Sequence, residues 1–188
     1  MKIERYRELR QIIGDSDFGG EIEWSENIRP PASPEAFGRE AIYIICNSGM
    51  RYTVARKIYD TLIPIVMRGG SASRTFGHKG KAEAIDWIWA ERNRLYEEFM
   101  ACQTDDDTLA YLSTLPWIGN ITKYHLAKNL GVDCAKPDRW LVRLSEHFGT
   151  DTHSLCRRLA EESGDRVATV DLVLWRAAER GLLYELSA

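Results

Sequence analysis

The amino-acid sequence predicts an all-α protein of about eight to ten helices. Apolar residues recur at every third or fourth position along most of the chain, which is the spacing of one face of a helix. No two segments alternate apolar and polar residues in the way that paired strands do. The proline and glycine of Leu115-Pro116-Trp117-Ile118-Gly119 favour a tight turn between two helical segments. The 188 residues, of which 44% are hydrophobic, suffice for one domain with a substantial core.

The first part of the chain predicts a short amphipathic helix over residues 2–13, followed by a long connector over residues 14–38. Three prolines oppose a regular helix through this connector. Trp24 is its only large apolar anchor, and we expect it to pack on the core. A buried helix is predicted over residues 35–47, with Pro34 at its first helical position. Its apolar run also suits a buried strand, but the neighbouring segments are helical.

A second amphipathic helix follows over residues 51–67, and a glycine-rich basic loop over residues 68–81. Residues 51–82 carry a net charge of +6, although the whole chain has a net charge of −3. A local excess of positive charge suits phosphate contacts, whereas the overall charge is no signature of nucleic-acid binding. The loop, with Lys79 and Lys81, is suited to follow a phosphate backbone, and an ordinary mobile surface loop is an equally good explanation.

Residues 82–101 predict a long helix that is rich in aromatic and aliphatic side chains. Trp87 and Trp89 are able to stack on a base, but packing in the core is the favoured explanation for both. Residues 105–113 predict a short helix with three aspartates in its first turn, where the helix dipole favours acids. This helix leads directly into the turn described above.

The helix that follows Gly119 is expected to end at Gly131, and its first N–H groups and positive dipole end suit a phosphate. A short connector then leads to Pro137 and Asp138, where a further helix begins. Asp138 occupies the N-cap position, which aspartate favours whatever its function.

Two more helices are predicted over residues 151–163 and 167–180, the second of which ends at Gly181. Asp171 in the last helix is either a second acid in a cleft or an ordinary acid near a helix N-terminus, and the second explanation is the more common one.

The four cysteines do not follow a metal-binding pattern, because their gaps are long and irregular and no C-x-x-C pair occurs. We therefore expect no metal and no cofactor. Free buried thiols and a charged N-terminal run in place of a signal peptide predict a cytoplasmic protein. No window of the sequence approaches the length of a membrane span, so no membrane partner is expected.

The turn at residues 115–119 and Asp138 together resemble the helix-hairpin-helix DNA glycosylase superfamily. The family hairpin reads approximately Leu-Pro-Gly-Ile/Val-Gly, and Trp117 stands here in place of its first glycine. The catalytic aspartate of the family follows at the start of the next helix, which is Asp138 in this chain. The clear match covers residues 115–149, and the flanking helices fit more loosely.

This resemblance implies a two-lobed helical fold with the active-site cleft between the lobes. It implies a single glycosylase-like domain over residues 1–188, with the hairpin motif at about residues 105–131 and the catalytic segment at residues 132–149. The four-cysteine cluster that some members of the superfamily carry near the C-terminus is absent. The partner implied is double-stranded DNA with a modified or damaged base, and the protein is expected to act as a monomer.

The resemblance and the local sequence patterns together suggest roles for individual residues. Asp138 is the catalytic residue. The residues assigned to DNA binding are Trp117, Gly119, Ile121, Thr122, Lys136, Arg139, Lys79 and Lys81. The residues assigned to base flipping or to the base pocket are Asn47, Ser48, Met50, Trp87, His125 and Trp140. An ordinary polar helix junction also explains the first three, and a packed or surface histidine is the more common explanation for His125.

One departure from the family pattern bears on the reaction type. Relatives with lyase activity carry a lysine two residues beyond the second hairpin glycine, where it forms a Schiff base with the sugar. That position is Ile121 here, and Lys123 and Lys128 lie at other positions of the helix. The resemblance therefore implies a monofunctional glycosylase that uses water as the nucleophile and leaves an abasic site.

Several alternatives remain open at this point. The base can be alkylated, deaminated or oxidised, or it can be an enzymatically modified base of phage DNA, in which case the protein serves antiviral defence. A relative on the same fold that modifies a base without removing it is a second possibility. A non-catalytic DNA-binding module, in which Asp138 is only a helix cap, is the third.

Overall fold

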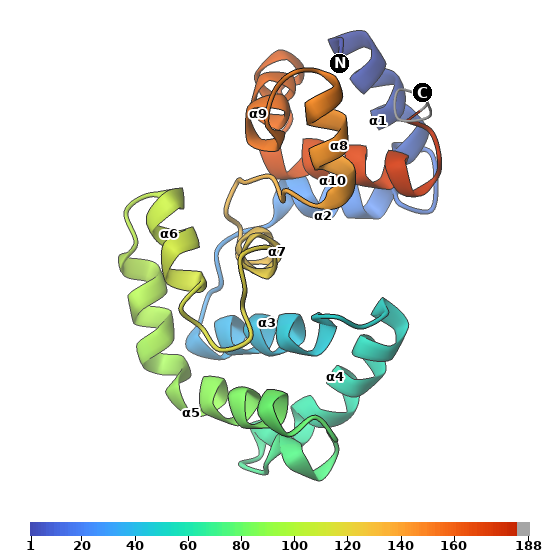
Figure 1. The fold of residues 1–188 in the computed structure, drawn as a ribbon. Helices are drawn as coiled ribbons and strands as arrows, with labels where there is room; N and C mark the ends of the chain where they lie inside the picture. Colours follow the sequence, from blue (N-terminus) through green and yellow to red (C-terminus); the bar gives the residue numbers. More distant parts are fainter. Residues whose placement is uncertain (184–188) are drawn as a thin grey trace. The chain divides into compact units, whose positions relative to one another are not determined.

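The computed structural model describes residues 1–183 and shows ten α-helices, one short 3₁₀ helix and no strand among them (Figure 1). The predicted all-α class is therefore confirmed. The last five residues of the predicted domain lie outside the described range. The chain forms two compact units, one made of Met1–Arg29 together with the segment from Val132 onward, and the other made of Pro30–Gly131.

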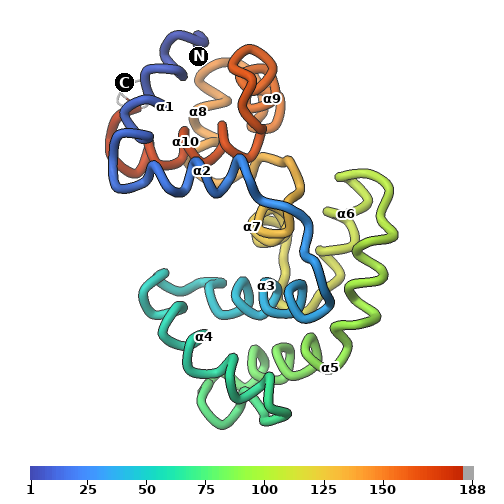
Figure 2. The backbone as a smooth tube through the Cα atoms, turned by 180° about the vertical axis from the view of Figure 1, so that it is seen from behind, coloured from blue at the N-terminus to red at the C-terminus, as the bar shows by residue number. Residues whose placement is uncertain are grey.

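The first unit is built around α10 (Val167–Glu179), whose Val170, Val173, Leu174 and Ala177 have no solvent exposure. Four other helices pack on α10, as the tube in Figure 2 shows from behind. They are α1 (Ile3–Gly14), α2 (Gly19–Asn27), α8 (Arg139–His147) and α9 (Thr152–Ser163). The core of this unit thus joins the N-terminal helices to helices that follow Val132 in the chain.

Helix α2 was not predicted, since residues 14–38 were expected to be a connector. The prolines that oppose a helix begin only at Pro30, and Ile22 of α2 is buried in the core of the first unit. The Arg176 guanidinium of α10 pairs with Glu21 and lies 4.0 Å from the centre of the Phe18 ring. These tertiary contacts stabilise a nine-residue helix of weak local propensity.

Trp24 lies on the outer face of α2, and the prediction that it packs on the core is wrong. Its exposed fraction is 51%. The buried positions of this short helix are Ile22 and Ser25.

The second unit is built around α3 (Pro34–Asn47), which packs on its neighbours with seven buried residues. Ser33 caps α3 by accepting a hydrogen bond from the Ala36 N–H, and Pro34 occupies the first turn as predicted. The buried helix expected here is thus confirmed and the strand is excluded. The other elements of the unit are α4 (Tyr52–Met67), η1 (Ala72–Arg74), α5 (Lys79–Ala101), α6 (Asp105–Leu112) and α7 (Thr122–Asn129).

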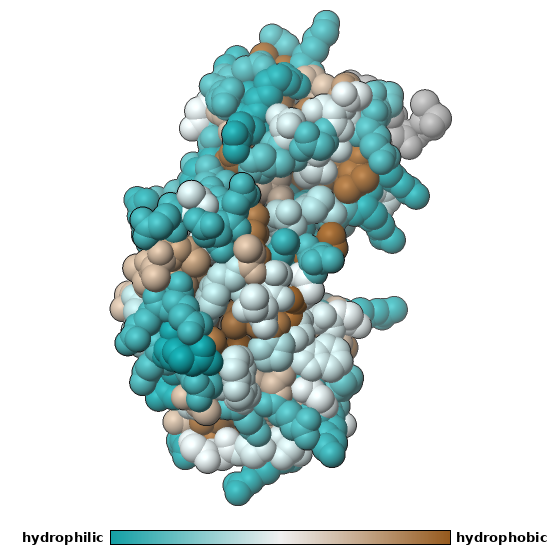
Figure 3. Space-filling view, turned by 60° about the vertical axis from the view of Figure 1, so that its left-hand side comes forward, coloured by the Kyte–Doolittle hydropathy of each residue, from teal (hydrophilic) through white to brown (hydrophobic). Residues whose placement is uncertain are grey.

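Some large apolar side chains of the second unit face solvent. The exposed fractions of Val54, Met100 and Trp87 are 47%, 51% and 41%. The favoured core position of Trp87 is therefore wrong, because the buried face of α5 runs through Ala84, Ile85 and Ile88 on either side of it. Hydrophilic residues nevertheless cover most of the face shown in Figure 3.

Among the helices of residues 1–183, none combines the length and the apolar character that crossing a membrane requires.

Candidate functional site

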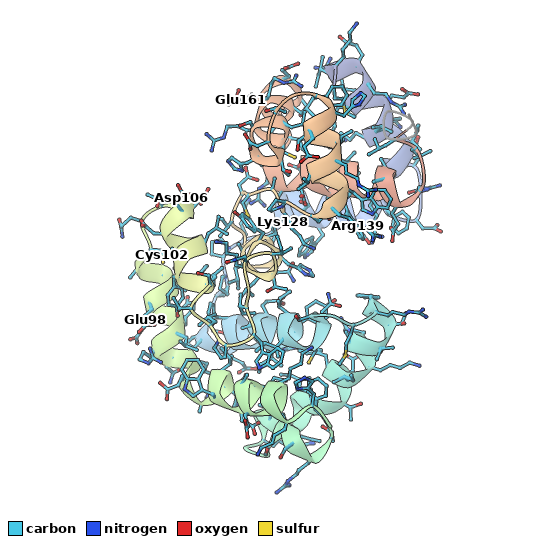
Figure 4. All side chains as sticks on the ribbon, viewed as in Figure 1. Glu98, Cys102, Asp106, Lys128, Arg139 and Glu161 are labelled. Carbon is cyan, nitrogen blue, oxygen red and sulfur yellow. The ribbon has the colours of Figure 1, made fainter. Side chains whose placement is uncertain are left out.

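The predicted hairpin is present in the second unit. Helix α6 ends at Leu112, and α7 begins at Thr122. Leu115 and Ile118 anchor the turn between them, since each is only 3% exposed. Asp106 lies in the first turn of α6, where the sequence predicted an acidic cluster (Figure 4).

The hydrogen bonds of the turn differ from the prediction at one group. The Gly119 N–H, expected to bind phosphate, donates to the Thr122 hydroxyl at 2.7 Å. The Lys123 N–H donates to the Gly119 carbonyl at 3.0 Å and so begins α7. Within residues 1–183, the backbone N–H groups of Asn120 and Ile121 have no acceptor. These two groups, at the positive end of α7, can therefore receive an anion.

Trp117 adopts a backbone conformation that is unusual for its type, with φ of 64°. A left-handed conformation costs a residue other than glycine about 1–2 kcal/mol, so its side chain must make compensating contacts. The indole Nε1–H donates to the Gly80 carbonyl at 3.0 Å, and the ring meets His78 edge-on at 4.9 Å. Trp117 thus packs against the start of α5, although 44% of the residue remains exposed.

Lys81 has an internal partner and is only 3% exposed, so it is not placed to contact phosphate as the sequence predicted. Its ammonium group donates to the Ser48 carbonyl, and burial lowers the pKa of Lys81. Lys79 differs, because 88% of its side chain is exposed and its only ion pair within residues 1–183 is a 3.8 Å contact with Glu83 along the helix surface.

Ser48 belongs to the junction between α3 and α4, where the sequence placed three base-flipping candidates. Asn47 ends α3, Gly49 has φ of 70°, and the Met50 N–H donates to the Asn47 carbonyl at 3.1 Å. All three candidates are half-buried. The structure therefore brings this junction, the start of α5 and the hairpin turn together within the second unit.

Two other candidates of this unit lie elsewhere. Trp87 lies farther along α5, with the Arg94 guanidinium 5.8 Å from its ring. His125 is half-buried on α7, the helix that also carries Lys128 (Figure 4).

Asp138 lies in the first unit as the N-cap of α8. Its Oδ1 accepts hydrogen bonds from the Trp140 N–H at 2.9 Å and from the Leu141 N–H at 3.2 Å. Within residues 1–183, Oδ2 has no hydrogen-bond partner. The same carboxylate therefore caps the helix with one oxygen and keeps the second for another partner.

The connector that precedes Asp138 is attached to α10 at two points. The Asp133 carboxylate caps α10 by accepting from the Ala168 N–H at 2.9 Å. Asp171, which is 2% exposed, accepts from the Lys136 N–H at 2.9 Å. Asp171 is thus a buried anchor of the connector, which neither of the two sequence explanations foresaw. A pairing between segments 35 residues apart leaves no local signal in the sequence.

The residues around Asp138 carry positive charge and one aromatic ring. Trp140 packs partly on the core of the first unit. The guanidinium groups of Arg139 and Arg143 lie 5.0 and 5.9 Å from its ring, and both arginines are exposed. Arg139 stands at the start of α8 in Figure 4. This surface suits a phosphate better than it suits a neutral ligand.

Sequence reasoning also missed a half-buried carboxylate in the second unit. Glu40 of α3 accepts a hydrogen bond from the Asn129 side chain of α7 at 3.1 Å. Burial raises the pKa of Glu40, against the opposing effects of this hydrogen bond and of the Arg39 charge.

No cluster of three or more histidine, cysteine, aspartate or glutamate side chains able to hold a metal ion occurs in the described part of the chain.

The comparisons with known proteins concern the fold. No family model and no curated protein sequence matches this chain. Among solved structures, it is similar to the 8-oxoguanine glycosylase/lyase of Methanocaldococcus jannaschii, crystallised in complex with a 15mer DNA that contains 8-oxoguanine. The TM-score is 0.65 at 17% identity, over 93% of this chain and 96% of that chain.

The 8-oxoguanine DNA glycosylase of Thermotoga maritima matches equally well, with a TM-score of 0.65 at 16% identity over the same shares of the two chains. The match spans nearly the whole of each protein, so it includes both units of this chain. This chain therefore has the all-helical fold of the 8-oxoguanine DNA glycosylases.

Proposed function

We propose that this protein is a monofunctional DNA N-glycosylase. It flips a damaged or modified base out of duplex DNA and hydrolyses the glycosidic bond, and an abasic site remains. The proposal combines the fold with the position of Asp138. The two similar structures are glycosylases by name, and one of them was crystallised with DNA.

The main support for the proposal is that the two oxygens of the Asp138 carboxylate differ in their hydrogen bonds. Oδ1 caps α8 through two backbone N–H groups, and this fixes the orientation of the side chain. Oδ2 is left for a ligand. An aspartate that served only as a cap would also show these two bonds, so the substitutions below separate the two roles.

The chemistry requires a fixed negative charge beside the sugar. When the bond between C1′ and the base nitrogen breaks, the base leaves with the bonding electrons and positive charge develops on the sugar. A carboxylate held beside C1′ stabilises that charge, and it orients a water whose oxygen adds to C1′ while a proton is released. Asp138 is the residue that supplies this carboxylate in the proposal.

We assign DNA binding to residues of the second unit. The Asn120 and Ile121 N–H groups receive a backbone phosphate, which holds DNA without reading its sequence. The exposed Lys79 adds positive charge on the neighbouring start of α5. The half-buried residues Asn47, Ser48 and Met50 are the candidates that fill the gap left by the flipped base.

The absence of a lyase step rests on Ile121, which is 45% exposed and has no amino group to attack the sugar. Lys123 lies with its ammonium 5.4 Å from the Tyr124 ring, and Lys128 lies in the last turn of α7. We therefore propose that water is the nucleophile, in contrast to the glycosylase/lyase named above.

An oxidised purine such as 8-oxoguanine is the first substrate to test, because it is the base named for both similar structures. Alkylated, deaminated and phage-type modified bases belong in the same panel, since the chain shares only 17% and 16% of its residues with those structures.

The experiment is base release from this panel of duplexes, with Asp138→Asn as the control. Asparagine caps a helix as well as aspartate does, so the variant keeps the fold and loses only the charge. We expect one duplex to yield free base with the wild type, and its strand to break only after alkali. Breakage without alkali, or a covalent adduct trapped by borohydride, would show a lyase. No release from any duplex would contradict the proposal.

A further inference from the structure

We propose that Trp117 is a positioning residue that joins the hairpin turn to the start of α5, so that both segments hold the same stretch of DNA backbone. The inference rests on the proposed function and assigns to Trp117 a role other than direct contact with DNA. It makes DNA binding by the hairpin dependent on a contact that lies outside the hairpin motif.

The contact is specific in its geometry. The indole Nε1–H donates to the carbonyl of Gly80, which lies in the first turn of α5. The ring edge meets the imidazole of His78, the N-cap residue of α5, at an interplanar angle of 86°. Trp117 therefore touches α5 at both its cap and its first turn.

Gly80 has no side chain to obstruct this approach. A Cβ atom built on Gly80 would lie 3.2 Å from Cζ2 of Trp117, and its three nearest neighbours are all atoms of the indole. Such a contact is tighter than most Cβ contacts in proteins, so alanine would require the indole to shift by a few tenths of an ångström. Glycine is otherwise unfavourable inside a helix, which points to the ring as the reason for it.

The backbone of the turn leads to the same conclusion. Glycine adopts a φ of 64° without strain, whereas here the residue with this φ is Trp117. Tryptophan is strained there, so the local backbone gains nothing from it. The gain lies in the contacts that the indole makes with α5.

The connection extends through Lys81 to the α3–α4 junction. The Lys81 ammonium lies 5.8 Å from the centre of the Trp117 ring and donates to the Ser48 carbonyl. Trp117, Lys81 and Ser48 thus link the hairpin turn, the start of α5 and the junction that carries the gap-filling candidates.

The groups that face outward from this linked region suit a phosphodiester backbone. The Asn120 and Ile121 N–H groups lie on the hairpin side, and the Lys79 ammonium lies on the α5 side. If Trp117 holds the two sides in register, these donors bind neighbouring phosphates together. Without the indole, each side has to be ordered separately when DNA binds.

The experiment measures binding to a duplex that carries a stable abasic-site analogue, as a function of salt, for the wild type and three variants. Trp117→Gly relieves the strain of the left-handed backbone conformation and removes the indole. Gly80→Ala displaces the indole, and the double variant completes a thermodynamic cycle. Trp24→Ala, which removes an exposed tryptophan from the first unit, is the matched control.

We expect Trp117→Gly to weaken binding about tenfold, which is within the usual range for coupled contacts. Gly80→Ala should weaken the wild type but leave the Trp117→Gly variant unchanged, because the displaced ring is already absent. Trp24→Ala should bind as the wild type does. Thermal unfolding of each variant shows whether it is folded at the temperature of the assay.

Lys79→Gln supplies a readout that a purely structural role would not affect. Loss of one phosphate contact lowers the slope of log affinity against log salt by about 0.9. We expect this change in the wild-type background and a smaller one in the Trp117→Gly background. If the wild type binds DNA but the cycle is additive and Lys79→Gln acts equally in both backgrounds, this inference is wrong and the proposed function stands. If the wild type binds no duplex, the proposed function fails first.

Discussion

At the scale of the single residue, Asp138 and Trp117 show which features a sequence pattern predicts and which it does not. The preference of aspartate for the start of a helix predicted that Asp138 is an N-cap, and two hydrogen bonds in the structure confirm that position. The contact of Trp117 with Gly80 joins residues 37 positions apart and has no sequence signal. The sequence predicts a cap from a few neighbours, whereas a side-chain contact between distant segments depends on the packed fold.

Glu40 provides a prediction about pH. Its pKa is raised by burial above the ordinary value of 4.5, so the folded protein binds this proton more tightly than the unfolded chain does. Its contribution to stability is therefore complete below pH 4.5 and is lost as the pH rises through the raised pKa. Glu40→Gln keeps an oxygen for Asn129 and removes the titration.

The measurement is urea unfolding of the wild type and Glu40→Gln from below pH 4.5 up to neutral pH. We expect the stability difference to shift in favour of the variant as the pH rises. If the difference in the free energy of unfolding between the two proteins does not change with pH, burial does not raise the pKa of Glu40.

At the scale of the element, most helices could be predicted because each carries its own periodic apolar face and its own end signals. Pro34 and Gly131 mark helix boundaries in the structure as they do in the sequence. Helix α2 could not be predicted, since Arg176 of α10 and the core of the first unit stabilise it. Trp87 was assigned wrongly because periodicity does not define a helix face to within one position.

The connector before Asp138 allows a prediction at this scale. Asp171→Ala leaves the Lys136 N–H without its acceptor, which costs about 1–3 kcal/mol if the group stays buried. Because the connector also sets the position of Asp138, we expect slower base release as well as lower stability. Asp171→Asn retains an acceptor oxygen and should recover most of both.

Urea unfolding and single-turnover base release, measured on the same preparations of the Asp171 variants, test this prediction. Equal loss in the alanine and asparagine variants would show that the charge of Asp171, and not its hydrogen bond to the connector, is what matters.

At the scale of the whole molecule, three of the four cysteines differ in burial and lie in different units. Cys46 is buried in the second unit and Cys156 in the first, whereas Cys102 is partly exposed at the end of α5 (Figure 4). Burial raises the pKa of the Cys46 thiol to about 12, so it stays protonated and unreactive in the folded state. We expect alkylation of the native protein to modify Cys102 first.

Mass spectrometry of the alkylated protein at increasing urea checks this order. Cys46 and Cys156 should react only as their own units unfold, so their two profiles measure the stability of each unit. Modification of Cys46 in the native protein as fast as that of Cys102 would contradict the packing of α3.

The overall fold was predictable to the level of class and of the likeness to known glycosylases, and the comparison with solved structures confirms that fold. Two short signals were enough, the turn at residues 115–119 and the aspartate at the start of a later helix. The division of the chain into one continuous and one discontinuous unit was not predictable, because the N-terminal helices pair with elements more than 100 residues away.

The most direct test of the central claim is single-turnover base release by Asp138→Asn, compared with its binding to a duplex that carries an abasic-site analogue. If the Asp138 carboxylate stabilises the charge that develops on the sugar, release should fall on the order of a hundredfold or more. Binding and thermal stability should stay close to those of the wild type, since asparagine keeps the helix cap. Unchanged release, or a loss of binding equal to the loss of release, would show that Asp138 is only a structural cap.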